Sequence, residues 1–156
     1  METKIKDFTQ TQTGFKVVQN GDLIQSINKM GQVFHQIDTK YLKEGILFHG
    51  WIGYRTNDQI KEVLDGHFME LYNKHKCKKM LIENSKMTGT FASINDWLTN
   101  VFMPKMIRMG LSFNAVVFPE NIFAQMAVED WDQKVGGFHN KSFGTVNEAL
   151  SWLRSA

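Results

Sequence analysis

Apolar and polar positions follow two different periods along the chain, and together they predict an α/β fold. Short apolar runs bounded by turn residues are typical of strands, whereas apolar residues three and four positions apart are typical of helices that bury one face. The predicted strands are residues 33–38, 45–52, 80–83, 113–118 and 140–143, and the predicted helices are residues 56–75, 93–109, 119–131 and 145–153. Strands that alternate with helices imply a mixed, mostly parallel sheet of about five strands with about four helices.

Capping signals set the ends of these helices. Thr56 with Gln59 and Thr145 with Glu148 have the spacing of capping boxes, in which two side chains satisfy backbone N–H groups at a helix start. Ser93 resembles a third cap, with Asp96 in the position that glutamate usually takes. Pro104 falls inside the same predicted helix and predicts a kink there, because proline lacks an N–H group.

The first 31 residues fit two interpretations. Asn20-Gly21 lies between short apolar runs, which favours a β-hairpin. Alternatively, Asp22 could cap a helix over residues 23–30, whose apolar residues share one helical face, and we favour this helix slightly. We therefore divide the chain into an N-terminal extension, residues 1–31, and an α/β domain, residues 32–156.

Composition and charge exclude several classes of protein. The net charge of the 156-residue chain is +2 and no dense basic block is present, which argues against a dedicated nucleic-acid binder. No apolar run is long enough for a transmembrane segment, and the first residues lack the apolar core of a signal peptide, so we expect a cytoplasmic protein. The single cysteine, Cys77, rules out an internal disulfide, and its neighbouring lysines could lower its thiol pKa.

Motifs for catalysis are absent from the sequence. It contains no phosphate-binding loop of the P-loop or GxGxxG type and no GxSxG nucleophile motif. His67 and His75 are eight positions apart with no acidic ligand in step, and His35, His49 and His139 form no spacing pattern with them. We therefore predict neither a metal site nor another cofactor, and we expect the protein not to be an enzyme.

The segment KMLIENSKMTGTFAS, residues 79–93, is the strongest candidate for a functional surface. It begins as a buried strand and continues into a loop rich in hydroxyl groups, and in open α/β sheets ligands gather at the carboxyl ends of strands. The candidates for contact with a protein partner or for phosphorylation are Asn84, Ser85, Thr88, Thr90, Ser93 and Trp97. The aromatic and methionine content suggests an alternative, a pocket for a small apolar ligand or lipid, lined by Phe102, Met106, Phe113 and Phe123.

Four segments, in their order along the chain, resemble a known family. They are GWIGYRTNDQI, KMLIENSKMTG, MGLSFNAVVFPE and SFGTVNEALSWL. In this order they resemble STAS-like domains, closest to the SpoIIAA-like family, whose fold is also compared with that of CRAL-TRIO lipid-binding domains. The resemblance covers about residues 32–156.

The resemblance implies a non-enzymatic regulatory domain that binds a protein partner. In some members of the family this binding is switched by phosphorylation of a serine after the middle strand. Those members have an Asp-Ser pair at that point, whereas this chain has Asn84-Ser85. We expect a STAS-like regulatory or protein-interaction domain, with a carrier or sensor of a small apolar ligand as the alternative, and a homodimer remains open.

Overall fold

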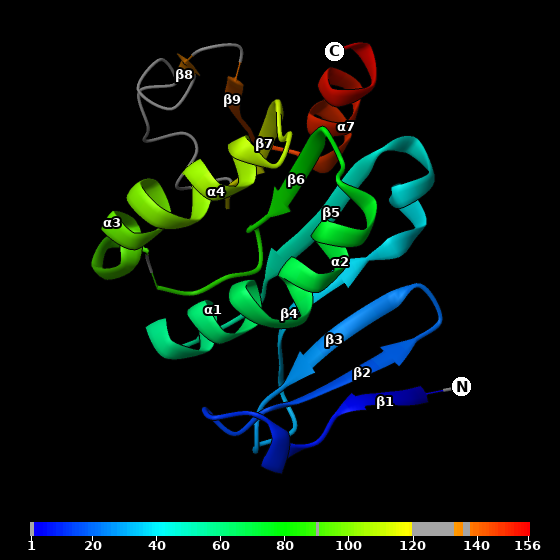
Figure 1. The fold of residues 1–156 in the computed structure, drawn as a ribbon, viewed down its shortest axis with the longest axis vertical. Helices are drawn as coiled ribbons and strands as arrows, with labels where there is room; N and C mark the ends of the chain where they lie inside the picture. Colours follow the sequence, from blue (N-terminus) through cyan, green and yellow to red (C-terminus); the bar gives the residue numbers. More distant parts are fainter. Residues whose placement is uncertain (1, 90, 120–132, 136–137) are drawn as a thin grey trace.

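The computed structural model describes residues 2–89, 91–119, 133–135 and 138–156, and these form an α/β fold around one mixed sheet (Figure 1). Nine strands of the described residues hydrogen-bond in the order β1-β2-β3-β4-β5-β6-β7-β9-β8. The strands are β1 Glu2–Lys6, β2 Lys16–Asn20, β3 Leu23–Ile27, β4 Val33–Asp38, β5 Ile46–Trp51, β6 Lys79–Glu83, β7 Phe113–Val117, β8 Gln133–Val135 and β9 Phe138–Phe143.

The direction of the strands changes at β5. Strands β1 to β5 pair antiparallel with one another in chain order. Strands β5, β6, β7 and β9 are parallel, and β8 pairs antiparallel with β9 at the edge. The prediction of a mixed α/β sheet is confirmed. The sheet is not mostly parallel, however, because five of the eight strand pairings in the described residues are antiparallel, and the predicted number of about five strands is too low.

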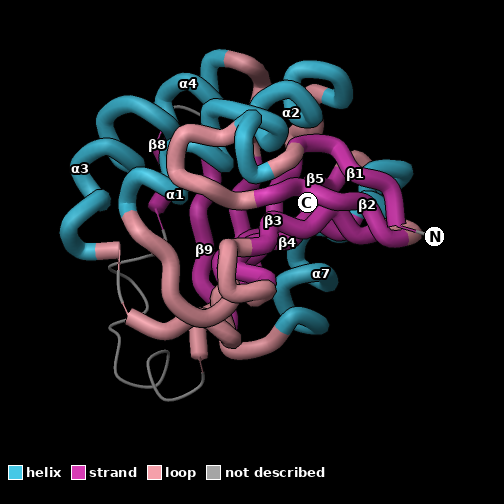
Figure 2. The backbone as a smooth tube through the Cα atoms, turned by 90° about the horizontal axis from the view of Figure 1, so that it is seen from below, coloured by secondary structure: helices cyan, strands magenta, loops and turns pink. Residues whose placement is uncertain are grey.

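Helices cover both faces of the sheet (Figure 2). The helical segments over one face are α1 Asn57–Val63, the π-helical turn η3 Leu64–Phe68, α2 Met69–His75, the 3-10 turn η4 Ala92–Ile94, α3 Asn95–Trp97, the π-helical turn η5 Leu98–Phe102 and α4 Met103–Arg108. Helix α7, Val146–Ser155, lies on the opposite face, and two 3-10 turns, η1 Phe8–Gln10 and η2 Thr39–Glu44, connect strands.

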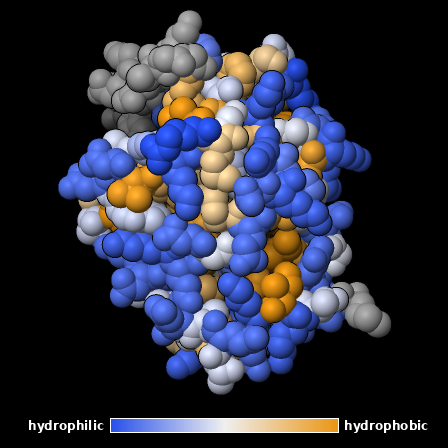
Figure 3. Space-filling view, viewed as in Figure 1, coloured by the Kyte–Doolittle hydropathy of each residue, from blue (hydrophilic) through white to orange (hydrophobic). Residues whose placement is uncertain are grey.

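The sheet separates the apolar core into two parts. The larger part lies between the sheet and the helices α1 to α4, and it contains Leu47, Trp51, Phe68 and Met80. The smaller part lies under α7 and contains Ile46 and other buried apolar residues. Because side chains alternate between the two faces of a strand, neighbouring residues of β5 enter different parts of the core. Figure 3 shows that the face carrying α1, α2 and α4 is mostly hydrophilic, with hydrophobic residues in small areas.

The helix predicted over residues 23–30 is wrong. These residues form β3 and the turn after it, and the alternative hairpin is the correct interpretation, with Gly21 at a positive φ of 59° in the turn. Strand β3 pairs along its length with β2 and with β4, and these ladder hydrogen bonds outweigh the local helical pattern. Residues 2–31 therefore continue the same sheet.

The helices predicted after Thr56 and after Thr145 are confirmed, but not all of their predicted caps form. Thr56 and Gln59 form the expected capping box. At the last helix only half of the box forms, because the Thr145 side chain accepts the N–H of Glu148 while the Glu148 carboxylate accepts from the Thr145 hydroxyl. Ser93 is not a cap, because the helix begins one residue earlier, at Ala92, and the Ser93 Oγ instead accepts a hydrogen bond from Asn57. Pro104 lies in the first turn of α4, which follows the π-helical turn η5. The helix predicted over residues 119–131 falls mostly outside the described residues.

Strands β5 and β6 approach each other closely at Gly50. A Cβ atom at this position would lie 2.0 Å from the backbone carbonyl oxygen of Glu83, which is far below a van der Waals contact. The obstacle is backbone, so it cannot move away as the end of a flexible side chain could. The pairing of these two parallel strands therefore depends on glycine at position 50.

We predict that Gly50→Ala lowers the free energy of unfolding by about 1–3 kcal/mol, the usual cost of overpacking a buried site. Urea denaturation followed by circular dichroism measures the change. Gly50→Ser is expected to cost at least as much, whereas Ser151→Ala, an exposed change on α7, is expected to stay within about 0.5 kcal/mol of the unmodified protein. An alanine variant of unchanged stability would contradict the close approach.

Candidate functional site

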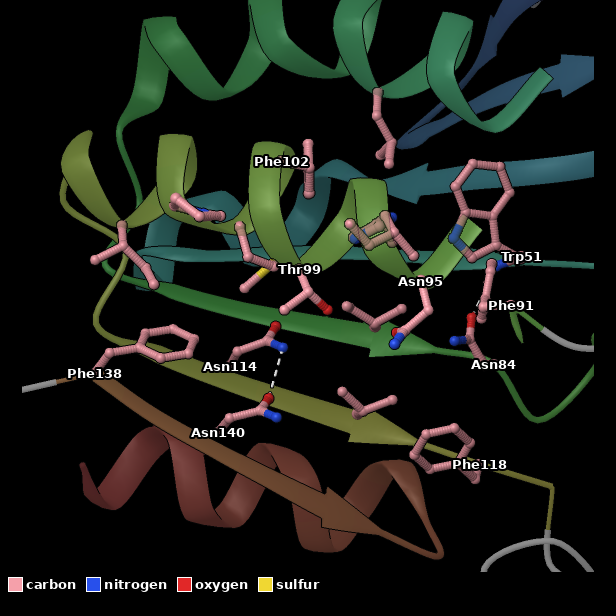
Figure 4. A pocket seen from close by; sticks show the side chains of 18 residues that line it. Trp51, Asn84, Phe91, Asn95, Thr99, Phe102, Asn114, Phe118, Phe138 and Asn140 are labelled. Atoms are coloured by element: carbon pink, nitrogen blue, oxygen red, sulfur yellow. Dashed lines mark hydrogen bonds between the residues drawn. The ribbon is translucent and has the colours of Figure 1, made fainter. Parts of the chain in front are cut away.

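A cavity of about 390 Å³ lies between the sheet and the helical segment that runs from α3 to α4 (Figure 4). Its floor is formed by β5, β6, β7 and β9, and its roof by residues of α3, η5 and α4. The apolar lining residues are Trp51, Leu64, Ile82, Phe91, Leu98, Phe102, Met103, Pro104, Ile107, Val116, Phe118 and Phe138. The polar lining residues are His49, Asn84, Asn95, Thr99, Asn114 and Asn140.

Two asparagines lie side by side on the floor. Asn114 of β7 and Asn140 of β9 are register partners, and alternation along each strand turns both side chains toward the helical roof. The Asn114 Nδ2 group donates a 2.8 Å hydrogen bond to the Asn140 Oδ1 atom (Figure 4). Asn114 is only 3% exposed, and its Oδ1 atom has no hydrogen-bond partner among the described residues.

The carboxyl ends of the parallel strands close one end of the cavity. Asn84, directly after β6, accepts a 3.4 Å hydrogen bond from the backbone N–H of Trp51 through its Oδ1 atom. The loop after β6 also pairs with the loop after β5, since the Thr88 N–H donates to the Gly53 carbonyl over 3.0 Å. Phe91 of this loop lines the cavity, and the Arg55 guanidinium lies 4.4 Å from its ring centroid.

Three histidines gather next to the cavity. His35 of β4 and His49 of β5 share a hydrogen bond, with 3.0 Å between the His35 Nε2 and His49 Nδ1 atoms. The His67 Nε2 atom lies 3.4 Å from the Ser26 Oγ atom, and its ring centroid is 6.4 Å from that of His35. All three rings are buried, and the second nitrogen of each has no partner within the described part of the chain.

Burial keeps these histidines uncharged at neutral pH. Loss of hydration lowers the pKa of His49 to about 3. Burial, together with the positive charge of Lys6, lowers the pKa of His67 to about 4. The pKa of His35 is also well below its ordinary value, through burial and the two neighbouring histidines. The spacing analysis missed this cluster, because the sheet and η3 bring together residues that are far apart in sequence.

The cluster does not have the form of a metal site. No group of three or more histidine, cysteine, aspartate or glutamate side chains in residues 2–89, 91–119, 133–135 and 138–156 could hold a metal ion. Cys77 is buried, and burial raises the pKa of its thiol, so the expectation of a lowered pKa is wrong. The lysines beside Cys77 in sequence do not offset its loss of hydration.

The residues predicted at the loop after β6 divide into two groups. Asn84 lines the cavity, whereas Ser85, Thr88 and Ser93 are exposed. Trp97 is half-buried and stacks on Phe102, with ring centroids 5.8 Å apart. Thr90 lies outside the described residues.

The predicted apolar-ligand residues are not all close together. Phe102 lines the cavity, and Met106 is fully buried in the core on the same side of the sheet. Phe113 packs on the opposite side, against His139 and Trp152. Phe123 lies outside the described residues.

Most of the polar lining was missed by the sequence analysis. The missed residues come from five separate elements, and no motif links them: His49, Asn95, Thr99, Asn114 and Asn140. One signal was available, because Asn114 interrupts the apolar strand FNAVVF with an amide that the strand must bury.

Comparison of the chain with protein-family models, with curated proteins and with solved structures finds no match. Among the helices that the structure describes, none has the length and apolar character needed to cross a membrane.

We predict that stability falls as the pH falls from 6.5 toward 4. In the unfolded chain the histidines titrate near pH 6.5, while in the folded chain His35, His49 and His67 stay neutral to a much lower pH. Below pH 6.5 the unfolded chain therefore binds more protons, and the free energy of unfolding decreases by about 1.4 kcal/mol per pH unit for each such histidine. Above pH 6.5 these three histidines are neutral in both the folded and the unfolded chain, so the free energy of unfolding keeps its full value there. Urea denaturation across this range measures the slope.

The variant His67→Gln tests one histidine of the cluster. We expect its pH slope to be smaller by about 1.4 kcal/mol per pH unit, because one titrating group is removed from the unfolded chain. Asn73→Gln is the control, since Asn73 is exposed on α2 and carries no titrating group, and its replacement is expected to leave the slope unchanged. A slope that His67→Gln does not alter would mean that the folded protein protonates this ring readily.

Proposed function

We propose that the protein binds a small, mostly apolar molecule in the cavity above β5, β6, β7 and β9. The observation that carries this proposal is a space of about 390 Å³ with a mainly apolar lining and a few uncharged polar groups. Ligand sites usually have volumes of about 300–1,000 Å³ and this composition. Water gains few hydrogen bonds against such walls, so an apolar molecule that replaces it is favoured.

The chemistry of the lining favours binding over catalysis. Asparagine and threonine side chains do not exchange protons near neutral pH. His49, whose pKa is about 3, is a weak base and stays unprotonated at neutral pH, so it serves poorly as either partner in general acid–base catalysis. A non-enzymatic carrier or sensor fits these groups better than an enzyme.

Binding of the uncharged fluorescent probe N-phenyl-1-naphthylamine tests this proposal. We expect its emission to rise with saturation when it is titrated into the folded protein. Thr99 lies at the roof of the cavity (Figure 4), so Thr99→Phe is expected to fill part of the space and to weaken probe binding by about tenfold or more.

Asn100→Phe is the matched control, because Asn100 is the next residue of the same helical turn, is exposed and does not line the cavity. Its probe affinity is expected to equal that of the unmodified protein. Val116→Phe, on the floor, provides a second filling variant. Equal probe binding by all four proteins would place the probe elsewhere and would contradict the proposal.

A contact surface for a protein partner is a second candidate. Ser85, Thr88 and Ser93 are exposed on the loop after β6, which suits a surface that a partner or a kinase reaches. The same loop supplies Asn84 and Phe91 to the cavity, so a ligand there would contact the base of this surface.

We expect peptide mapping by mass spectrometry, on protein purified from its native cells, to find phosphate on Ser85, Thr88 or Ser93 if this surface is switched. Phosphate only on exposed serines elsewhere, such as Ser151, would argue against the loop as the switch. Substitution of Ser85, Thr88 and Ser93 by alanine is expected to abolish the mapped modification and to leave binding of the probe unchanged.

A further inference from the structure

Positive side chains gather at the edge of the sheet where β6 and β7 begin. The sequence has no long basic block, but the fold brings together cations from the end of α2 and from α4. Figure 1 shows the ends of both helices at this edge. These side chains, which we call the basic edge, are Lys74, Lys76, Lys78, Lys105 and Arg108.

Backbone hydrogen bonds join the two segments of the basic edge. The N–H groups of Ser112 and Phe113 both donate to the Lys78 carbonyl oxygen, over 2.8 and 3.0 Å. Ser112 follows shortly after Arg108 in the sequence, so Lys78 lies beside the short link between α4 and β7. On α4, Lys105 and Arg108 are three positions apart and therefore lie on one side of the helix.

The positive charge of the basic edge is exposed and only partly offset. All five residues are exposed, and none of them forms an ion pair with a carboxylate of the described residues. Glu44, which precedes β5, is already bonded to Arg154, and Glu70 is the acidic residue of α2, one turn before Lys74. The carboxyl ends of α2 and α4 each contribute about half a negative charge. Five cations exceed these contributions, so most of the positive charge remains.

Helix α4 belongs both to the basic edge and to the roof of the cavity. Met103, Pro104 and Ile107 of this helix line the cavity, whereas Lys105 and Arg108 are exposed. Ile107 is also 38% exposed, so an apolar side chain lies next to the two cations of α4. A surface that contacts α4 through its cations is therefore next to the wall of the cavity.

An anionic membrane fits this combination better than a nucleic acid does. Both carry negative phosphate groups, and clusters of lysine and arginine are attracted to either. A membrane also has apolar chains directly beneath its head groups, which an exposed apolar side chain such as Ile107 can contact. The phosphate backbone of a nucleic acid offers no such apolar layer. Small apolar molecules of the kind that the cavity suits also concentrate in membranes.

We propose that the basic edge docks the protein onto the surface of a membrane that contains anionic phospholipids. The lysines and Arg108 contact the phosphate and carboxylate groups of the lipids, and Ile107 contacts the apolar layer below them. Docked in this way, the protein has α4 and the adjoining cavity wall at the membrane. The choice of a membrane rests in part on the proposed function, but the docking itself requires only the cations of the edge.

Sedimentation of the unmodified protein with lipid vesicles tests this proposal. Vesicles of equimolar phosphatidylserine and phosphatidylcholine are expected to bind the protein at least about tenfold more tightly than vesicles of phosphatidylcholine alone. Raising the salt concentration from about 0.15 M to about 0.5 M is expected to weaken this binding several-fold, because exposed charges are screened.

Two double variants of equal net charge locate the contact. Lys78→Gln with Arg108→Gln removes one cation from each segment of the basic edge, and each lost charge is expected to weaken binding to the anionic vesicles about fivefold. Lys29→Gln with Lys86→Gln is the control, because both lysines are exposed and follow the ends of β3 and β6, at the opposite edge of the sheet. Its vesicle binding is expected to stay within about twofold of that of the unmodified protein. All four changes are at exposed positions, so both proteins are expected to fold.

Several results would overturn the inference. They are the absence of vesicle binding, equal binding to vesicles of phosphatidylcholine alone, and equal losses in the two double variants. Short duplex DNA that binds at a lower phosphate concentration than the vesicles do would assign the basic edge to nucleic acid instead.

The same measurements separate this inference from the proposed function. The cavity-filling variant Thr99→Phe is expected to bind the anionic vesicles as the unmodified protein does, since Thr99 is not part of the basic edge. If the vesicles do not bind but N-phenyl-1-naphthylamine binds in the cavity, the inference is overturned and the proposed function stands. If the vesicles bind as expected but the probe does not bind in the cavity, the proposed function fails and the docking surface stands.

Discussion

On the face of the sheet under α1 to α4, buried polar side chains must have hydrogen-bond partners, and the arrangement of the strands depends on this requirement. This face buries His35, His49, Asn84 and Asn114 among apolar side chains, and each of them has a hydrogen bond to another strand or loop. Because these side chains are uncharged, each hydrogen bond adds only a modest amount to the stability of the fold. A buried polar atom without a hydrogen bond, however, loses its hydration with nothing in return. The pairs therefore fix the neighbouring strands relative to one another, and they leave one nitrogen of His49 and the side-chain oxygen of Asn114 without a partner among the described residues.

The sequence predicted correctly those helices and strands in which the apolar positions have the spacing of the element and are the positions that become buried. The helix that follows Thr56 and the last helix after Thr145 have both a cap and a continuous apolar face, and both formed where expected. Residues 23–30 fit both a helix, which the sequence slightly favours, and a strand, since a short apolar run does not separate the two periods. Pairing with β2 and β4 decided the outcome, and such long-range pairing is not visible in a single short segment.

The candidate site was predictable only in part, for a related reason. The loop after β6 was found because its position at a strand end has a general meaning, and its Asn84 does line the cavity. His49 and Asn140 carry no local signal, because their role depends on which strands become neighbours. Asn114 was the exception, since an amide inside FNAVVF had to be buried and had to find a partner. A polar residue in an otherwise apolar strand is therefore a better guide than a count of histidines.

The lowered pKa values explain why a cluster of histidines suits a binding cavity. A histidine with a pKa near 6.5 would carry a partial charge at neutral pH, and a charge beside an apolar cavity would hold water there. Burial lowers the pKa of His49 to about 3, so the ring remains a neutral donor and acceptor. The hydrogen bond between His35 and His49 holds the two rings together. The same burial that lowers stability in acid thus keeps the His49 ring beside the cavity without charge.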